Sequence, residues 1–278
     1  MDCGWGRTRS WVPEIPHLEC FRAVGFVHEY PRHCHATWAI GVVDQGMGGI
    51  WYRGAHECGG PGELITINPG EVHTGYPLEK QGISYSMLYV ASELVRDALL
   101  DPTRLPVFPG IVRDSALALR LRRLCRWLER GGPSLALETR LLFDLRCLFL
   151  RHARVEERQR TGREPQHVAR MKEYLRANLQ RNVRLEELAR LTGLSKAYLI
   201  RSFRRLVGMP PYEWLLQWRI ESARLRLQEG CPISELAIEL GFADQSHFHR
   251  RFKSITGVTP AAYLAGHYRS RQPRAGPA

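Results

Sequence analysis

The sequence predicts an α+β protein with a β-rich front half, a helical pair, and an all-α back half. In the back half, two helix-turn-helix motifs are joined by a long helix. Three observations predict this fold class. Residues 21–90 form short apolar runs separated by Gly, Pro, Asn and Asp turns, as in a sandwich or barrel. From Asp114 the apolar spacing becomes helical. Residues 185–264 contain an internal duplication.

These changes in pattern also set the expected domain boundaries. A chain of 278 residues is long enough for two domains with separate cores. We expect an N-terminal arm over residues 1–20, a barrel over 21–110, a helical pair over 111–153, a linker over 154–166, a helical domain over 167–266 and a disordered tail over 267–278.

Three histidines of the β-rich region are predicted to share one site. His33 and His35 alternate at the start of a strand, so both side chains point to one face. His73 ends the stretch from Pro61, a strand followed by a tight turn. These two motifs resemble those of the cupin barrel, in which His-x-His and a later His meet inside a jelly roll. The resemblance implies a cupin-like barrel.

The occupant of this barrel is predicted from one missing residue. Metal-holding cupins place a Glu after three or four intervening residues, where this chain has Ala39 and Ile40. Three imidazoles can still hold a divalent ion, but the missing carboxylate favours a small organic effector. We therefore expect no metal and no other cofactor. The predicted effector-binding residues are His33, His35, Trp38, His73 and Tyr76.

The stretch 114–153 is predicted to form two Leu-rich helices. Asp114 and Ser115 cap the first helix, Gly131-Gly132-Pro133 ends it, and Ser134 opens the second. Two interpretations stay open. The pair covers one side of the barrel, or its outer stripe forms a homodimer interface.

The duplication repeats one helix-turn-helix. Leu188 and Gly193 recur as Leu236 and Gly241 at an offset of 48 residues, and after the turn the offset is 49 because Ala243 is inserted. The glycines let the chain leave the first helix in a left-handed conformation. The next helix begins at an N-cap oxygen, supplied by Ser195 in the first copy and Asp244 in the second.

The second helix of each copy carries the predicted contacts to DNA. One face is apolar and packs inward, whereas the other holds mostly donors and cations, as a helix in the major groove requires. The predicted DNA-binding residues are Lys196, Ala197, Ile200, Arg201, Arg204, Gln245, Ser246, His247 and Arg250. A pair of basic hairpins with a solvated outer face is the alternative, but two copies in register favour DNA binding.

Charge and cysteine usage support this interpretation. The net charge of +12 is concentrated in residues 165–278, which hold 19 Lys and Arg against 9 Asp and Glu. Such an excess indicates a polyanionic partner. The seven cysteines form no CxxC pair, which suits a reducing compartment. No apolar run reaches membrane-spanning length. We expect a cytoplasmic protein without a membrane partner.

The C-terminal motifs resemble those of AraC/XylS-type bacterial transcription regulators. They are Gly241-Phe242, then Ser246-x-Phe248-x-Arg250-x-Phe252-Lys253, and Gly257-x-Thr259-Pro260-x-x-Tyr263. The resemblance implies a sequence-specific regulator, expected to be an activator, that answers to an effector in the barrel. Implied partners are promoter or operator duplex DNA, a small-molecule effector, RNA polymerase and a second copy. We expect no enzymatic activity; the alternative is a metal-dependent cupin enzyme fused to a DNA-binding domain.

Overall fold

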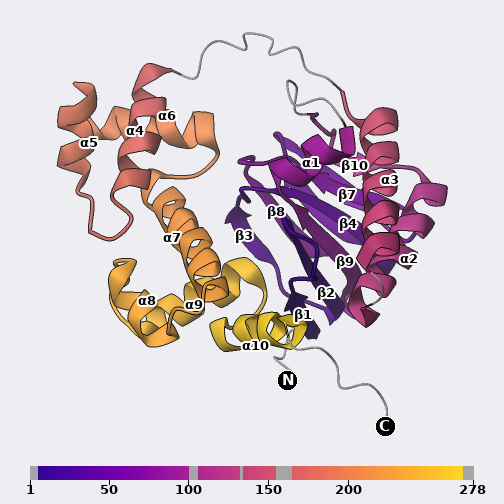
Figure 1. The fold of residues 1–278 in the computed structure, drawn as a ribbon. Coiled ribbons are helices and arrows are strands. Elements are labelled where there is room, and N and C mark those ends of the chain that lie inside the picture. Colours follow the sequence, from indigo (N-terminus) through magenta and orange to yellow (C-terminus); the bar gives the residue numbers. More distant parts are fainter. Residues whose placement is uncertain (1–5, 100–105, 132–133, 155–164, 272–278) are drawn as a thin grey trace. The chain divides into compact units, whose positions relative to one another are not determined.

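The computed structural model describes residues 6–99, 106–131, 134–154 and 165–271. Its contacts divide the chain into two compact units, one built mainly from residues 1–30 and 35–156 and the other mainly from residues 157–260 (Figure 1). All the described strands lie between Arg7 and Val112, and the described chain from residue 166 onward is helical. The predicted fold class is confirmed.

Two antiparallel sheets form the first unit. The larger sheet has the strand order β1-β2-β9-β4-β7-β10, and the smaller has the order β3-β8-β5-β6. The strands of the larger sheet are β1 (Arg7–Trp11), β2 (Leu18–Phe26), β9 (Ile83–Val90), β4 (Trp38–Gln45), β7 (Leu64–Ile67) and β10 (Ile111–Val112). Those of the smaller sheet are β3 (Tyr30–His33), β8 (His73–Pro77), β5 (Gly48–Tyr52) and β6 (Ala55–Gly59).

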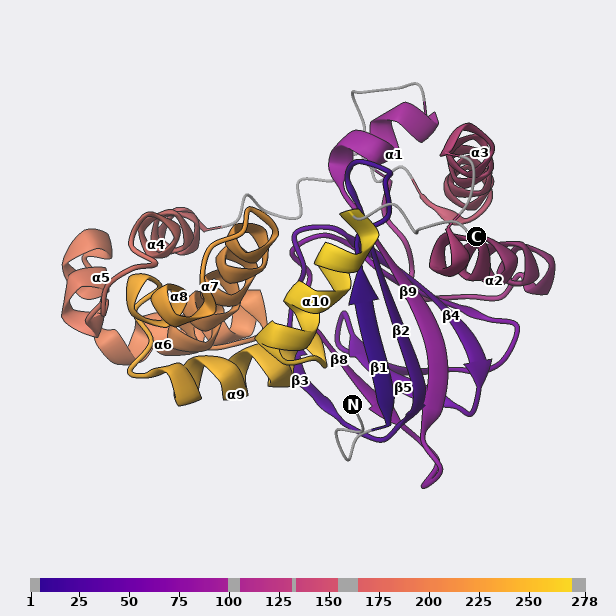
Figure 2. The same ribbon diagram turned by 60° about the horizontal axis from the view of Figure 1, so that its bottom comes forward.

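Helices cover one face of the larger sheet. They are α1 (Ser92–Leu99), α2 (Ser115–Arg130) and α3 (Ser134–His152). Asp114 caps α2 as predicted, because its carboxylate accepts from the Leu117 amide at 2.9 Å. Figure 2 shows α2 against β4 and β9. Trp38 and Leu64 of the sheet and Leu121 and Leu145 of the helices share one buried core, so the helical pair covers this sheet.

The second unit consists of two helix-turn-helix motifs on a long helix. Its helices are α4 (Gln166–Ala177), α5 (Leu185–Thr192), α6 (Lys196–Val207), α7 (Pro211–Gln228), α8 (Ile233–Glu239) and α9 (Gln245–Thr256), and α10 (Pro260–Arg271) follows. The predicted caps are confirmed, since Ser195 accepts from the Tyr198 amide and Asp244 from the His247 amide. Helix α7 has 18 residues, so it is about 27 Å long.

A buried arginine joins the two motifs. Arg219 of α7 is 1% exposed, and its guanidinium donates to three backbone carbonyls. Two of them belong to the loop between α4 and α5, where Leu179 accepts at 2.8 Å and Arg181 at 2.8 Å. The third is the Gly241 carbonyl in the turn of the second motif, at 2.6 Å. One side chain therefore links the loop that leads into the first motif to the turn of the second.

Two glycine substitutions test this junction. Gly193 (φ +72°) and Gly241 (φ +69°) are both left-handed, a conformation in which an alanine costs roughly 1–2 kcal/mol. An added Cβ meets nothing within 4 Å at Gly193, but at Gly241 it lies 2.7 Å from Arg219 Nη2 and 2.9 Å from the Gln180 carbonyl oxygen. In urea unfolding, we expect Gly241→Ala to lose more unfolding free energy than Gly193→Ala. Equal losses would contradict the close packing at Gly241.

The structure corrects three of the expected boundaries. Arg7–Trp11, in the expected arm, forms β1, because pairing with β2 along the sheet edge supplies order that local composition does not reveal. Ser92–Leu99, in the expected barrel range, is helix α1. Helix α10 continues to Arg271, past the expected start of the tail at residue 267.

Two further expected segments fall largely outside the described residues. They are most of the linker 154–166 and residues 272–278 of the tail. Along the part of the chain that is described, no helix combines the length and the apolar character needed to cross a bilayer.

Candidate nucleic-acid interface and histidine cluster

The exposed face of α6 carries the residues that the sequence predicts for the first motif. Leu199 and Phe203 are fully buried, which fixes the rotation of the helix because they lie one helical turn apart. All five predicted contact residues on this helix are exposed: Lys196, Ala197, Ile200, Arg201 and Arg204. The structure thus places them together on the side that faces away from the domain core.

Helix α9 repeats this arrangement with different side chains. Phe248 and Phe252 are fully buried, while Gln245, Ser246 and Arg250 are exposed. His247 is half-buried, with its ring centroid 5.5 Å from that of Phe242. Burial, followed by the charge of Arg251, lowers the pKa of His247 below its ordinary value. At neutral pH this imidazole is therefore a neutral donor and acceptor, suited to a base edge.

The cations of the two faces differ in their availability. Among the described residues, Arg201, Arg204 and Arg250 form no ion pair with an acidic side chain. Lys196 instead pairs with Glu186 of α5, and this ammonium lowers the pKa of the Glu186 carboxyl. A solvent-exposed pair of this kind adds little stability, so a phosphate can displace Glu186.

The chemistry of the two faces suits the major groove of a duplex. An arginine can pair with the O6 and N7 acceptors of guanine, and a glutamine with adenine, which gives Arg201, Arg250 and Gln245 the capacity to read bases. Ala197 and Ile200 lack donors, so they can contact only thymine methyl groups or other apolar surface. The two helices therefore present unlike sets of contacts.

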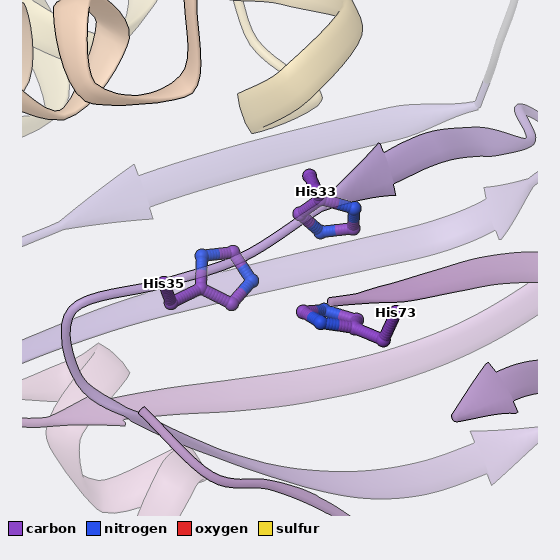
Figure 3. A group of neighbouring side chains, drawn as sticks. All are labelled: His33, His35 and His73. Carbon is purple, nitrogen blue, oxygen red and sulfur yellow. The ribbon is translucent and has the colours of Figure 1, made fainter. Parts of the chain in front are cut away.

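The three predicted histidines lie together in the barrel. His33 ends β3, His35 follows two residues later, and His73 begins β8, the neighbour of β3 in the smaller sheet. They are 4%, 7% and 5% exposed, and their ligand nitrogens lie within 4.8 Å of one another. Figure 3 shows the three rings pointing toward one another.

The structure does not bring Trp38 and Tyr76 to this cluster. Trp38 is paired with Val90 on the face that packs against helices, where its ring centroid lies 6.2 Å from that of Phe149. Tyr76 lies three residues after His73 on β8, so the two side chains point to opposite faces. Its hydroxyl lies 3.0 Å from Nδ1 of the exposed His56.

Tyr89 is a neighbour of the cluster that the sequence did not single out. Its ring centroid lies 5.0 Å from that of His35. Leu88 and Val90 on either side of it belong to the core under the helices, so alternation turns Tyr89 toward the other face of β9. That alternation was readable from the sequence once the helix-facing residues were known.

Two family models match the chain. Residues 188–266 match a helix-turn-helix domain, and residues 15–143 match an AraC-like ligand-binding domain. The first match contains both faces described above, and the second contains the three histidines.

Relatives and a solved structure agree with these matches. An HTH-type transcriptional regulator of Bacillus subtilis, YbfI, is 27% identical over 245 residues, covering 87% of this chain and 89% of that protein. The HTH-type transcriptional activator AarP of Providencia stuartii is 33% identical over 91 residues, or 32% of this chain and 67% of AarP. The crystal structure of a ToxT variant from Vibrio cholerae, in its apo form, has a TM-score of 0.58 at 13% identity, with 89% of this chain and 96% of that chain covered.

ToxT shares the fold, and YbfI aligns with the chain over most of both proteins. The chain belongs to the AraC-type transcription regulators, which are DNA-binding proteins, and it carries an AraC-like ligand-binding domain before its helix-turn-helix domain.

Proposed function

We propose that the chain regulates transcription by placing α6 and α9 in successive major-groove turns of one operator. The observation that carries the proposal is that α6 and α9 expose equivalent positions of the two copies. Arg201 and Arg250 occupy equivalent positions of the two copies, and both are exposed without an acidic partner among the described residues. Helix α7, about 27 Å long, separates the copies, and successive turns of a duplex lie about 34 Å apart.

We further propose that an effector bound in the barrel controls this activity. The buried histidine cluster, His33, His35 and His73, with Tyr89 beside it, lies inside the domain that matches the AraC-like ligand-binding model and supports this proposal. An effector shifts an equilibrium only by its difference in affinity for two states. Binding must therefore favour one arrangement of the regulator over another.

A selection experiment tests the mode of DNA binding. We expect the full chain, incubated with a library of random duplexes, to enrich a site with two specific blocks about one helical turn, 10–10.5 base pairs, apart. The two blocks should differ in sequence because α6 and α9 present different side chains. Enrichment of a single short block, or of no sequence at all, would contradict insertion of both helices.

Three finer expectations stay predictions. The relatives AarP and RhaS are named transcriptional activators, which supports activation over repression for this chain. Contact with RNA polymerase is the corresponding partner prediction. Homodimerisation is the other, and the exposed apolar side chains Leu135, Phe143 and Leu150 of α3 are its proposed contacts.

A further inference from the structure

The hydrogen bonds behind the histidine cluster carry information that the sequence does not. Nδ1 of His33 lies 2.8 Å from the Pro31 carbonyl oxygen, and Nδ1 of His73 lies 3.1 Å from the Glu71 carbonyl oxygen. A carbonyl oxygen can only accept, so both Nδ1 atoms carry the proton. In the neutral imidazole, the lone pair is then on Nε2. This arrangement, with the second ring nitrogen bonded to a backbone carbonyl, accompanies most metal-bound histidines.

The third ring completes the geometry. The ring centroid of His35 lies 5.0 Å from that of His73. The His35 ring also contacts Tyr89, with 5.0 Å between their centroids. The ligand nitrogens of the three residues are within 4.8 Å of one another. A zinc-like ion takes imidazole nitrogens at about 2.0–2.1 Å, which in a tetrahedral arrangement places them roughly 3.3 Å apart. Closing around an ion thus needs each ring to move inward by less than about 1 Å.

The surroundings decide which ion the cluster suits. All three ligands are neutral nitrogen donors, and the nearby Glu71 carboxylate is held by Arg53 at 2.6 Å and 2.9 Å. Magnesium and calcium require oxygen ligands, whereas imidazole suits zinc, nickel, copper and iron. Three histidines also leave a coordination position open, as in three-histidine zinc sites.

We propose that His33, His35 and His73 bind one divalent transition-metal ion, His33 and His73 through Nε2 and His35 through one ring nitrogen. The open position of the ion takes a water molecule or an oxygen donor of the effector. The ion would thereby become part of the effector site, and the regulatory consequence rests on the effector control proposed above. The ion site itself does not depend on DNA binding, and no reaction is assigned to it.

Direct titration tests the proposal. The full chain, freed of any affinity tag and stripped with a chelator, is titrated with Co²⁺ and followed by its visible ligand-field absorption. We expect saturation at one ion per chain, and displacement of Co²⁺ by one equivalent of Zn²⁺. Absence of a saturable spectral change, or uptake below one equivalent, would overturn the proposal.

Substitutions locate the ion. Removing a residue that hydrogen-bonds a metal ligand typically weakens metal binding 10- to 100-fold. Removing a ligand itself should cost more, so we expect His33→Ala, His35→Ala and His73→Ala each to weaken metal binding by more than about 100-fold. His56→Ala is the matched control, because this histidine is exposed on β6 and bonded to Tyr76. It should bind the ion as the unchanged chain does. Unchanged affinity in the three cluster variants, or lost affinity in His56→Ala, would place the ion elsewhere.

A measurement on the unchanged chain covers the case in which a variant fails to fold. X-ray absorption of the Zn²⁺-loaded protein should show three imidazole nitrogens at about 2.0–2.1 Å. Sulfur ligands, or fewer than three imidazoles, would reject the site. Duplex selection with the metal-free chain distinguishes failure of the metal site from failure of the DNA-binding proposal. If the chain selects a DNA site but takes up no ion, only the metal site is refuted.

Discussion

Replacing Arg219 with alanine is expected to destabilise the DNA-binding domain by about 3 kcal/mol or more, because each buried carbonyl left without its donor costs about 1–3 kcal/mol. The side chain is buried, and burial lowers the pKa of its guanidinium below the ordinary value. Its cost of desolvation is offset by the three carbonyls that it contacts. Without it, the carbonyls of Leu179, Arg181 and Gly241 lose their donor together. Urea unfolding of the full chain, followed by helical circular dichroism, measures the loss.

Two further substitutions sharpen this prediction. Arg219→Lys keeps the charge but cannot direct three donors along the required lines, so we expect it to recover less than half of the lost stability. Arg205→Ala removes the same group from an exposed position of α6 and should change stability by no more than about 0.5 kcal/mol. If Arg219→Ala proved no more damaging than Arg205→Ala, the joining role of Arg219 would be refuted.

The double variant Arg201→Ala/Arg250→Ala is expected to show the largest loss of DNA affinity. Each arginine that pairs with a base contributes about 1–3 kcal/mol. The two lie on different helices, so their effects should add. The sum corresponds to a roughly 30-fold to 10⁴-fold weaker Kd for the selected duplex, measured by fluorescence anisotropy at fixed salt. Each single variant should also tolerate base changes in one block of the site only.

The control for this prediction removes a positive charge without touching the proposed interface. Arg170 is exposed on α4, and Arg170→Ala should leave sequence preference unchanged. Lys196→Ala is a useful intermediate, because a residue that contacts only phosphate weakens binding equally for all sequences. Retention of full affinity and preference by the double variant would exclude these arginines from the groove.

The helical half was predictable from sequence because its signals are local. A left-handed glycine, an N-cap oxygen and an apolar pair one turn apart each act within a few residues. Ser195, Asp244, Gly193 and Phe252 therefore lie where the sequence placed them. Arg219 was missed for the opposite reason. An arginine in a helix usually indicates a solvated face, and its three acceptors are 22 to 40 residues distant in the chain.

The barrel was predictable in outline but not in the facing of its side chains. Residues 33 to 35 carried their own alternation, and the three histidines came together as expected. Tyr76 could have been excluded, since an odd separation from His73 along one strand reverses the face. Trp38 could not have been excluded from the sequence, because both faces of its strand are buried. Only its pairing with Val90 shows that its side chain lies on the face that packs against helices. The order of strands in a sheet is a long-range property that no local motif encodes.

The two copies of the duplicated motif agree in their buried phenylalanines and differ in their exposed side chains. Lys196 and Ala197 in one correspond to Gln245 and Ser246 in the other. A DNA site that is bound by two unlike helices of a single polypeptide is asymmetric, so it has a direction along the duplex. Its base sequence alone would then dictate which way the regulator points along the promoter, with no need for a palindrome. Reversing that site in place would reverse the order in which α6 and α9 follow each other along the promoter.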